Sequence, residues 1–263
     1  MDRFTEVLAD LAAESQVLDA LVAPLDEAGW RTATPAAGWD VATQVAHLAW
    51  TDEATVAATQ GGHEWARIVA AAGEDVTALV EDGARTGAAS APAELLERWR
   101  RSRAACAEAL RGVPDGTKVP WFGPRMSATS MATARFMETW AHSVDVHDAL
   151  GVASPRTDRV RHVAFLGAVP RGFAVLAHRR PAPEEPVLLV LTLPSGAEWR
   201  HGDPDATSRV TGSAHDFALR VTQRRHRDDL DLLAHGDVAD EWLDVAQAFA
   251  GPPGSGRPPV SRG

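Results

Sequence analysis

Residues 131–151 read MATARFMETWAHSVDVHDALG, and the interpretation of the whole chain rests on this stretch. It has no glycine or proline before Gly151, and Ser127 stands where an N-cap is expected, so it predicts one long helix. Glu138 and His142 are four residues apart, which places both side chains on one face. Apolar neighbours predict burial, and a buried carboxylate and imidazole require a partner or a metal ion.

A second helix, predicted over residues 41–60 after the capping residue Asp40, carries His47 in its middle. In a bundle of four helices, side chains from facing helices meet in the core, and metal sites are built there. His47, Glu138 and His142 would supply two imidazoles and one carboxylate. This donor set suits zinc or another divalent transition metal, and three protein ligands leave one coordination position open.

The residues alone leave other interpretations open. A glutamate and a histidine at this spacing are commonly a surface pair, and a single core histidine such as His47 is commonly a hydrogen-bonded structural residue. Asp145 extends the same stripe, either as an acceptor that orients a ligand histidine or as a solvated acid. The chain contains neither HExxH nor G-x-S-x-G nor a glycine-rich phosphate loop, so these three catalytic motifs do not apply.

Composition restricts the classes of function. The formal net charge of −10 argues against a nucleic-acid-binding surface and disfavours anionic membranes. Cys106 is the only cysteine, which excludes an internal disulfide and fits a cytoplasmic protein. The first residues form an amphipathic helix pattern rather than a signal peptide, and no membrane span is predicted. We expect a small-molecule substrate, while the oligomeric state stays open.

The chain changes character at about residue 180. Further helices are predicted over residues 4–28, 64–82 with a break near Gly73, 91–112 with Ser90 as cap, and 158–178. Beyond PAPEEP, strands are predicted on both sides of a turn at residues 194–196 and at 208–212, followed by helices over 214–225 and 238–250. The prediction is therefore a mainly α protein: a helical bundle over 1–180, a small α/β domain over 181–250, and a flexible tail over 251–263.

Two segments, GWDVATQVAHLAWTDEATVA (38–57) and RFMETWAHSVDVHDALG (135–151), resemble the N-terminal domain of the mycothiol-dependent maleylpyruvate isomerase family. That family belongs to the wider DinB-like group of four-helix metalloproteins. The resemblance covers most of the first 180 residues. It implies that His47, Glu138 and His142 bind a divalent metal, typically zinc.

The C-terminal segments TGSAHDFALRVTQRRH (211–226) and LDLLAHGDVADEWLDVAQAF (230–249) resemble the small α/β domain of the same family, which is related to sterol-carrier-type folds. In the isomerase an arginine of this domain reaches toward the substrate site. Arg224 or Arg225 is the nearest match here, although QRRH departs from the isomerase pattern. A solvated helix end is the alternative role for these two arginines.

The resemblance implies a metal-dependent enzyme that uses a low-molecular-weight thiol, mycothiol, as its cofactor. The metal would activate a thiolate that adds to a small electrophilic substrate, as in an isomerase or an S-transferase. The tail differs from the isomerase, which suggests a sister group with another substrate. Two alternatives remain: a hydrolase that activates water on the metal, and a non-catalytic protein that binds a metal or an apolar ligand.

Overall fold

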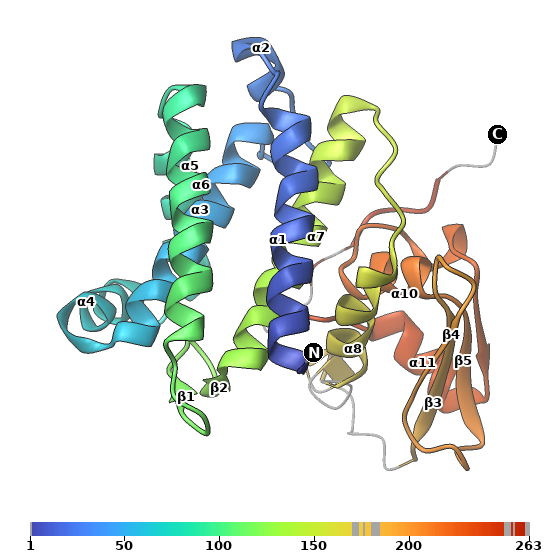
Figure 1. The fold of residues 1–263 in the computed structure, drawn as a ribbon. Helices are drawn as coiled ribbons and strands as arrows, with labels where there is room; N and C mark the ends of the chain where they lie inside the picture. The colour runs from blue at the N-terminus through green and yellow to red at the C-terminus, as the bar shows by residue number, and fades with distance from the viewer. Residues whose placement is uncertain are drawn as a thin grey trace. The chain divides into compact units, whose positions relative to one another are not determined.

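The computed structural model describes residues 2–169, 174–175, 177–179, 185–249, 254 and 256–260. The chain divides into two compact units, Met1–Ser154 and Pro155–Gly263, which are described separately (Figure 1). The division falls earlier than the boundary predicted at residue 180. The reason is that helix α8 (Arg161–Ala168) packs against α10 (Ala214–Val221) and so belongs to the second unit.

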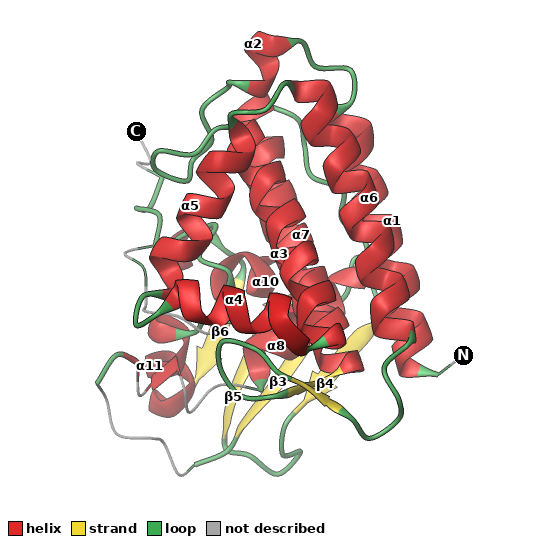
Figure 2. Cartoon of the chain, turned by 90° about the vertical axis from the view of Figure 1, so that its left-hand side faces the viewer, coloured by secondary structure: helices red, strands yellow, loops and turns green. Residues whose placement is uncertain are grey.

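The first unit is built from helices. Its described helices are α1 (Arg3–Val22), α2 (Glu27–Trp30), α3 (Val41–Gln60), α4 (Gly62–Ala72), α5 (Val76–Ala88), α6 (Pro92–Arg111) and α7 (Ala128–Leu150). The short strands β1 (Lys118–Val119) and β2 (Met126–Ser127) pair antiparallel just before α7. The long helices α1, α3, α6 and α7 pack together, with α5 beside α3, which confirms the predicted bundle (Figure 2).

Local sequence signals explain where the two central helices begin and end. The Ser127 hydroxyl accepts a hydrogen bond from Ser130 N at 3.1 Å, and Gly151 ends α7 with φ +66°, where a side chain would be strained. The Asp40 carboxylate accepts from Thr43 N at 2.8 Å at the start of α3. Both predicted caps are confirmed.

Two helix boundaries differ from the prediction. The first helix ends at Val22 rather than near residue 28, because Pro24 follows and Asp26 caps the separate short helix α2. The predicted cap of α6 at Ser90 is wrong. The helix begins at Pro92 after Ala91 without a side-chain cap, since proline supplies a preset φ and has no N–H to satisfy.

An ion-pair cluster joins α1 to α6 beside the core. Asp19 accepts hydrogen bonds from Arg100 at 2.8 and 3.0 Å and from Arg103 at 2.6 Å. The hydrogen bonds and charges of these two arginines lower the pKa of Asp19 below its ordinary value, against the opposing effect of burial. The carboxylate is therefore ionised at neutral pH and bridges two guanidinium groups.

Replacing Asp19 with alanine is expected to lower the free energy of unfolding by about 2 kcal/mol, between the values for exposed and for buried pairs. A carboxyl with a depressed pKa stabilises the fold above its unfolded pKa and loses this effect as the pH falls through its folded pKa. The difference from wild type should therefore shrink on acidification. Urea denaturation measures it, with Glu97→Ala, an exposed partner of Arg100, as the control; equal losses in both variants would contradict the account.

The second unit contains a mixed sheet. Its described elements are η1 (Asp158–Val160), α8, β3 (Val187–Thr192), β4 (Glu198–His201), β5 (Ser208–Ser213), α10, η2 (Arg227–Asp229), β6 (Leu232–His235) and α11 (Asp237–Val245). The strand order is β4-β3-β5-β6, with β3 and β5 parallel and the other pairs antiparallel. A mainly helical protein with a small C-terminal sheet, as predicted, is confirmed.

Several details of this unit refine the prediction. The turn at residues 194–196 and the cap at Ser213 are present. Strand β6 was not predicted, and α11 ends at Val245 rather than at residue 250. The predicted helix over 158–178 is described in full only to residue 169, and the predicted flexible tail lies partly outside the described residues. Across the described ranges, every helix is too short or too polar to cross a bilayer.

His215, a buried residue of α10, is expected to make folding sensitive to acid. Burial and the charge of Arg156 lower the pKa of His215 from 6.5 to about 4. Between these two values the unfolded chain binds more protons than the folded chain, so stability falls as the pH falls, by at most about 1.4 kcal/mol per pH unit. Denaturation of wild type and His215→Asn across this range tests the effect; the variant should show a shallower dependence, and identical slopes would contradict it.

Candidate metal centre

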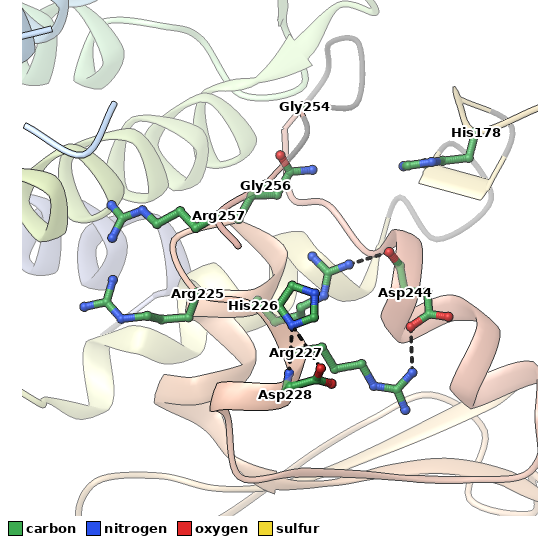
Figure 3. A pocket seen from close by; sticks show the side chains of 11 residues that line it. His178, Arg225, His226, Arg227, Asp228, Asp244, Gly254, Gly256 and Arg257 are labelled. Carbon is green, nitrogen blue, oxygen red and sulfur yellow. Dashed lines mark hydrogen bonds and ion pairs between the residues drawn. The ribbon is translucent and has the colours of Figure 1, made fainter. Parts of the chain in front are cut away.

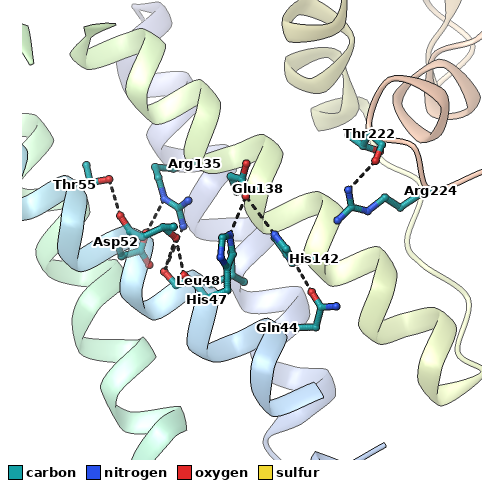
Figure 4. A network of polar contacts seen from close by, with 11 residues as sticks. Gln44, His47, Leu48, Asp52, Thr55, Arg135, Glu138, His142, Thr222 and Arg224 are labelled. Atoms are coloured by element: carbon teal, nitrogen blue, oxygen red, sulfur yellow. Dashed lines mark hydrogen bonds and ion pairs between the residues drawn. The ribbon is translucent and has the colours of Figure 1, made fainter. Parts of the chain in front are cut away.

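Three predicted ligand residues come together inside the bundle. His47 lies on α3, while Glu138 and His142 lie one turn apart on α7 (Figure 4). His47 Nε2 is 3.1 Å from Glu138 Oε2, and His142 Nε2 is 3.2 Å from the same oxygen. One donor atom from each residue lies within 4.8 Å of the other two. A single carboxylate oxygen therefore faces two imidazole nitrogens.

These distances fit a tetrahedral ion. Two ligand atoms about 2.0–2.1 Å from a tetrahedral zinc are about 3.3 Å from each other. The two observed separations are close to this value. Two nitrogens and one oxygen also match the donor preference of zinc, and three protein ligands leave a fourth position for a small molecule.

The contacts of His142 support the fit independently. The carbonyl oxygen of Gln44 contacts His142 Nδ1, and a carbonyl oxygen only accepts hydrogen bonds. His142 Nδ1 therefore carries the proton, and in the neutral ring Nε2 presents a lone pair toward Glu138 Oε2. Two lone pairs repel at this distance unless a proton or a metal ion lies between them. A proton on His142 Nε2 or a metal ion at the centre of the three residues satisfies this contact.

Glu138 is ionised in the neutral range. Burial alone would raise its pKa, but hydrogen bonds from His142 and His47, and the positive charge of these rings when they are protonated, lower that pKa well below its ordinary value. The ring of Trp39 covers the two histidines: it stacks on His142 at 5.8 Å between ring centroids and 14° between planes, and lies 5.4 Å from His47. The centre therefore combines one negative charge with an aromatic wall.

A buried ion pair fixes the two ligand helices against each other. Arg135 on α7 donates from Nε to Asp52 Oδ1 on α3 at 3.0 Å and from Nη2 to the Leu48 carbonyl at 3.4 Å. Both charged residues are buried. Burial would lower the pKa of Arg135, but the charge of Asp52 keeps it above its ordinary value, so the guanidinium stays charged. Arg135 lies three residues before Glu138 and Asp52 lies five residues after His47, so the pair fastens the two helices close to the ligands.

The other predicted site residues are placed as follows. Asp145 is buried on α7, and the acceptor that contacts His142 Nδ1 comes from Gln44 instead. Arg224 and Arg225 follow the end of α10, and each donates from Nη1 to a nearby backbone carbonyl, Thr222 O and Arg224 O respectively, at 2.7 Å. A catalytic role for Asp145, Arg224 or Arg225 stays a prediction.

Arg225 also lines a cavity of about 380 Å³ within the second unit (Figure 3). Two other arginines in its wall have structural partners. Arg220 donates to the backbone carbonyls of Leu243 at 2.7 Å and Asp244 at 2.6 Å, at the end of α11. Arg227 is bonded to Asp240 and Asp244 of the same helix. These two cations therefore hold α11 in place.

Four residues near the centre were not predicted: Gln44, Trp39, Asp52 and Thr34, whose hydroxyl oxygen accepts a hydrogen bond from Gln44 Nε2 at 2.8 Å. Gln44 and His47 are three residues apart on one helix, so the sequence indicates that they share a face. It does not indicate that Gln44 contacts His142, which lies 98 positions away. Trp39 falls inside the segment that carries the family resemblance. For Asp52, the sequence shows only an acidic residue on a mainly apolar helix and does not indicate its partner.

Comparisons with known proteins concern the family and the fold of this chain. A family model described as the mycothiol maleylpyruvate isomerase N-terminal domain matches residues 11–147, more than half of the chain. Two uncharacterised proteins of Mycobacterium tuberculosis, from strains CDC 1551 / Oshkosh and H37Rv, are 51% identical over 250 residues, covering 95% of this chain and 97% of each relative.

Two solved structures share the fold. They are the crystal structures of the mycothiol-dependent maleylpyruvate isomerase and of a His→Ala mutant of it. Each matches with a TM-score of 0.60 at 18% identity, covering 88% of this chain and 92% of the solved chain. At this identity the likeness shows a common fold, and the family model shows more: the chain belongs to the family of the mycothiol maleylpyruvate isomerase N-terminal domain.

Proposed function

We propose that this protein is a divalent-metal-dependent enzyme that uses a low-molecular-weight thiol, mycothiol, on a small electrophilic substrate. The observation that carries the proposal is the convergence of His47, Glu138 and His142 on one point in a bundle of this family. We infer zinc as the metal from the donor set, and cytoplasm as the location from the lone cysteine and the family.

The three ligand residues would hold the ion with one negative charge among them. A bound divalent ion lowers the pKa of a thiol and so supplies a thiolate at neutral pH. His47 and His142 would donate nitrogen lone pairs to the ion, and the Glu138 carboxylate would offset part of its positive charge. Trp39 stacks on His142 and excludes water from that side of the pair. The open coordination position is left for the thiol.

The chain has no suitable nucleophilic thiol of its own. Cys106 is its only cysteine, and it is buried on α6. Burial, with the nearby charge of Asp52, raises the pKa of the Cys106 thiol far above its ordinary value. This thiol therefore stays protonated and inert. A thiol from outside the chain removes the need for it.

The remaining groups would act on the substrate. A thiolate that adds to an electrophilic carbon gives a stable conjugate, or, after rotation and loss of the thiolate, a cis–trans isomer. We propose that Arg224 or Arg225 binds an anionic group of the substrate and that Asp145 orients a ligand. We also propose that the second unit, which contains both arginines, is a sterol-carrier-like domain.

Binding of the thiol to the metal is the step to test. Cobalt(II) replaces zinc in such sites and reports a thiolate ligand by a charge-transfer band in the near ultraviolet. Adding mycothiol to the cobalt-loaded protein is expected to produce this band in wild type and not in His142→Ala. A cobalt-loaded wild type without the band would contradict the thiol mechanism. Turnover of an ester or amide without any thiol would favour the hydrolase instead.

A further inference from the structure

We infer that Gln44 is a positioning residue for the metal centre: its amide oxygen holds the Nδ1–H of His142, so that Nε2 presents its lone pair to the ion. Thr34 in turn holds the Gln44 amide in the orientation that this requires. The inference rests on the proposed metal-dependent function and names residues that neither the ligand set nor the family description includes.

The orientation of the Gln44 amide follows from its neighbours. Thr34 Oγ1 is 2.9 Å from the Trp39 carbonyl oxygen, which can only accept a hydrogen bond. The threonine hydroxyl therefore donates its single proton to that oxygen. The same hydroxyl oxygen is 2.8 Å from Gln44 Nε2 and must accept from it. The NH₂ end of the amide is thereby fixed on Thr34. The carbonyl end is left facing His142 Nδ1.

This chain of hydrogen bonds selects one tautomer of His142. With Nδ1–H donated to Gln44, the neutral imidazole has its lone pair on Nε2, the nitrogen 3.2 Å from Glu138 Oε2. If the amide were reversed, an NH₂ group would face Nδ1 and favour the opposite tautomer, with a proton where the ion should bind. Gln44 is fully buried, so water does not compete for its amide.

Gln44 also connects the two ligand helices. It stands three residues before His47 on α3, yet its contact is to the histidine of α7 (Figure 4). Helix α3 therefore supplies one ligand and orients another. Such hydrogen bonds to ligand histidines fix the ring and raise its basicity, and losing one typically lowers metal affinity about 10- to 100-fold.

His47 and His142 differ in the contacts of the ring nitrogen that faces away from Glu138. His47 Nδ1 is buried without a hydrogen-bond partner among the described residues, so packing and the contact of Nε2 with Glu138 Oε2 orient its ring. His142 has both Gln44 and the stacked Trp39 ring, 14° from parallel. The Trp39 backbone also ends the hydrogen-bond chain through Thr34. We therefore expect the orientation of His142 to depend on this chain.

The test measures zinc affinity by competition with a chelator in wild type, Gln44→Met and Gln44→Glu. Gln44→Met keeps the approximate size and removes the acceptor, so it is expected to weaken binding about 10- to 100-fold. Gln44→Glu keeps an acceptor for Nδ1–H and is expected to bind zinc as tightly as wild type or more tightly. A role in packing alone predicts the reverse order, because a buried carboxylate harms the fold more than methionine does.

Two further measurements separate the possible failures. Thr34→Val removes the hydroxyl that orients the Gln44 amide. This variant is expected to weaken zinc binding, but less than Gln44→Met does, and it tests the inference if Gln44→Met folds poorly. The visible spectrum of the cobalt form should change in Gln44→Met, reporting a reoriented ligand. If wild type binds zinc and both Gln44→Met and Thr34→Val bind it equally well, the inference is overturned. If wild type itself binds no zinc, the proposed function fails first.

Discussion

Glu138→Ala is expected to abolish tight zinc binding and thiol-dependent turnover while the helical bundle stays folded. Glu138 Oε2 is the atom that both imidazoles face, at 3.1 and 3.2 Å. Without it, two neutral nitrogens remain and no charge offsets the ion. The loss should exceed the factor of about 100 that marks the upper end for residues that only orient ligands. Zinc titration against a chelator measures the affinity, and far-ultraviolet circular dichroism checks the fold.

The matched control is Glu53→Ala. Glu53 is a glutamate of α3 that lies outside the ligand set and forms an exposed ion pair with Arg98 at 2.7 Å. This variant should bind zinc with the affinity of wild type. Tight binding by Glu138→Ala, or equal weakening in both variants, would show that the carboxylate is not a ligand.

Asp52→Ala is expected to cost about 3–5 kcal/mol of folding free energy, the range for breaking a buried ion pair from one side. The substitution leaves the Arg135 guanidinium charged and buried, and its hydrogen bond to the Leu48 carbonyl oxygen at 3.4 Å remains. Because the pair ties α3 to α7 beside the ligands, zinc affinity should fall as well. Urea denaturation of the metal-free protein measures the stability.

The double variant Asp52→Leu/Arg135→Met is the control for this effect. Replacing both charges with apolar groups of similar size leaves no unpaired charge, and such exchanges are often neutral or stabilising. The double variant should therefore be more stable than Asp52→Ala. If Asp52→Ala loses less than about 1 kcal/mol, as an exposed pair would, the pair does not fasten the helices.

The features that the sequence predicted best are those set by neighbouring residues: the ends of the helices and the spacing of side chains along one helix. Helix α7 and helix α3 have their N-caps at Ser127 and Asp40 and end at glycines, and these signals act within a few residues. The spacing of Glu138 and His142 placed them on one face by helix geometry alone. It left open whether that face was exposed. The predicted four-helix bundle added His47 as a third candidate ligand, and the resemblance to a known family then implied that the three residues bind a metal.

What the sequence did not show depends on contacts between distant positions. Gln44 of α3 contacts His142 of α7, and Arg135 of α7 contacts Asp52 of α3. No local pattern indicates which polar residue of one helix meets which residue of another. The same limit explains the boundary near residue 180: helix α8 looks like a continuation of the bundle until its packing against α10 is known.

Titration of the metal-free protein with zinc is the most direct test of the central claim. We expect one zinc ion to bind tightly per chain, with release of protons as any imidazolium at the centre gives way to the ion. The binding should vanish in His47→Ala and in Glu138→Ala alike. A wild-type protein that binds no divalent metal, although folded, would contradict the claim.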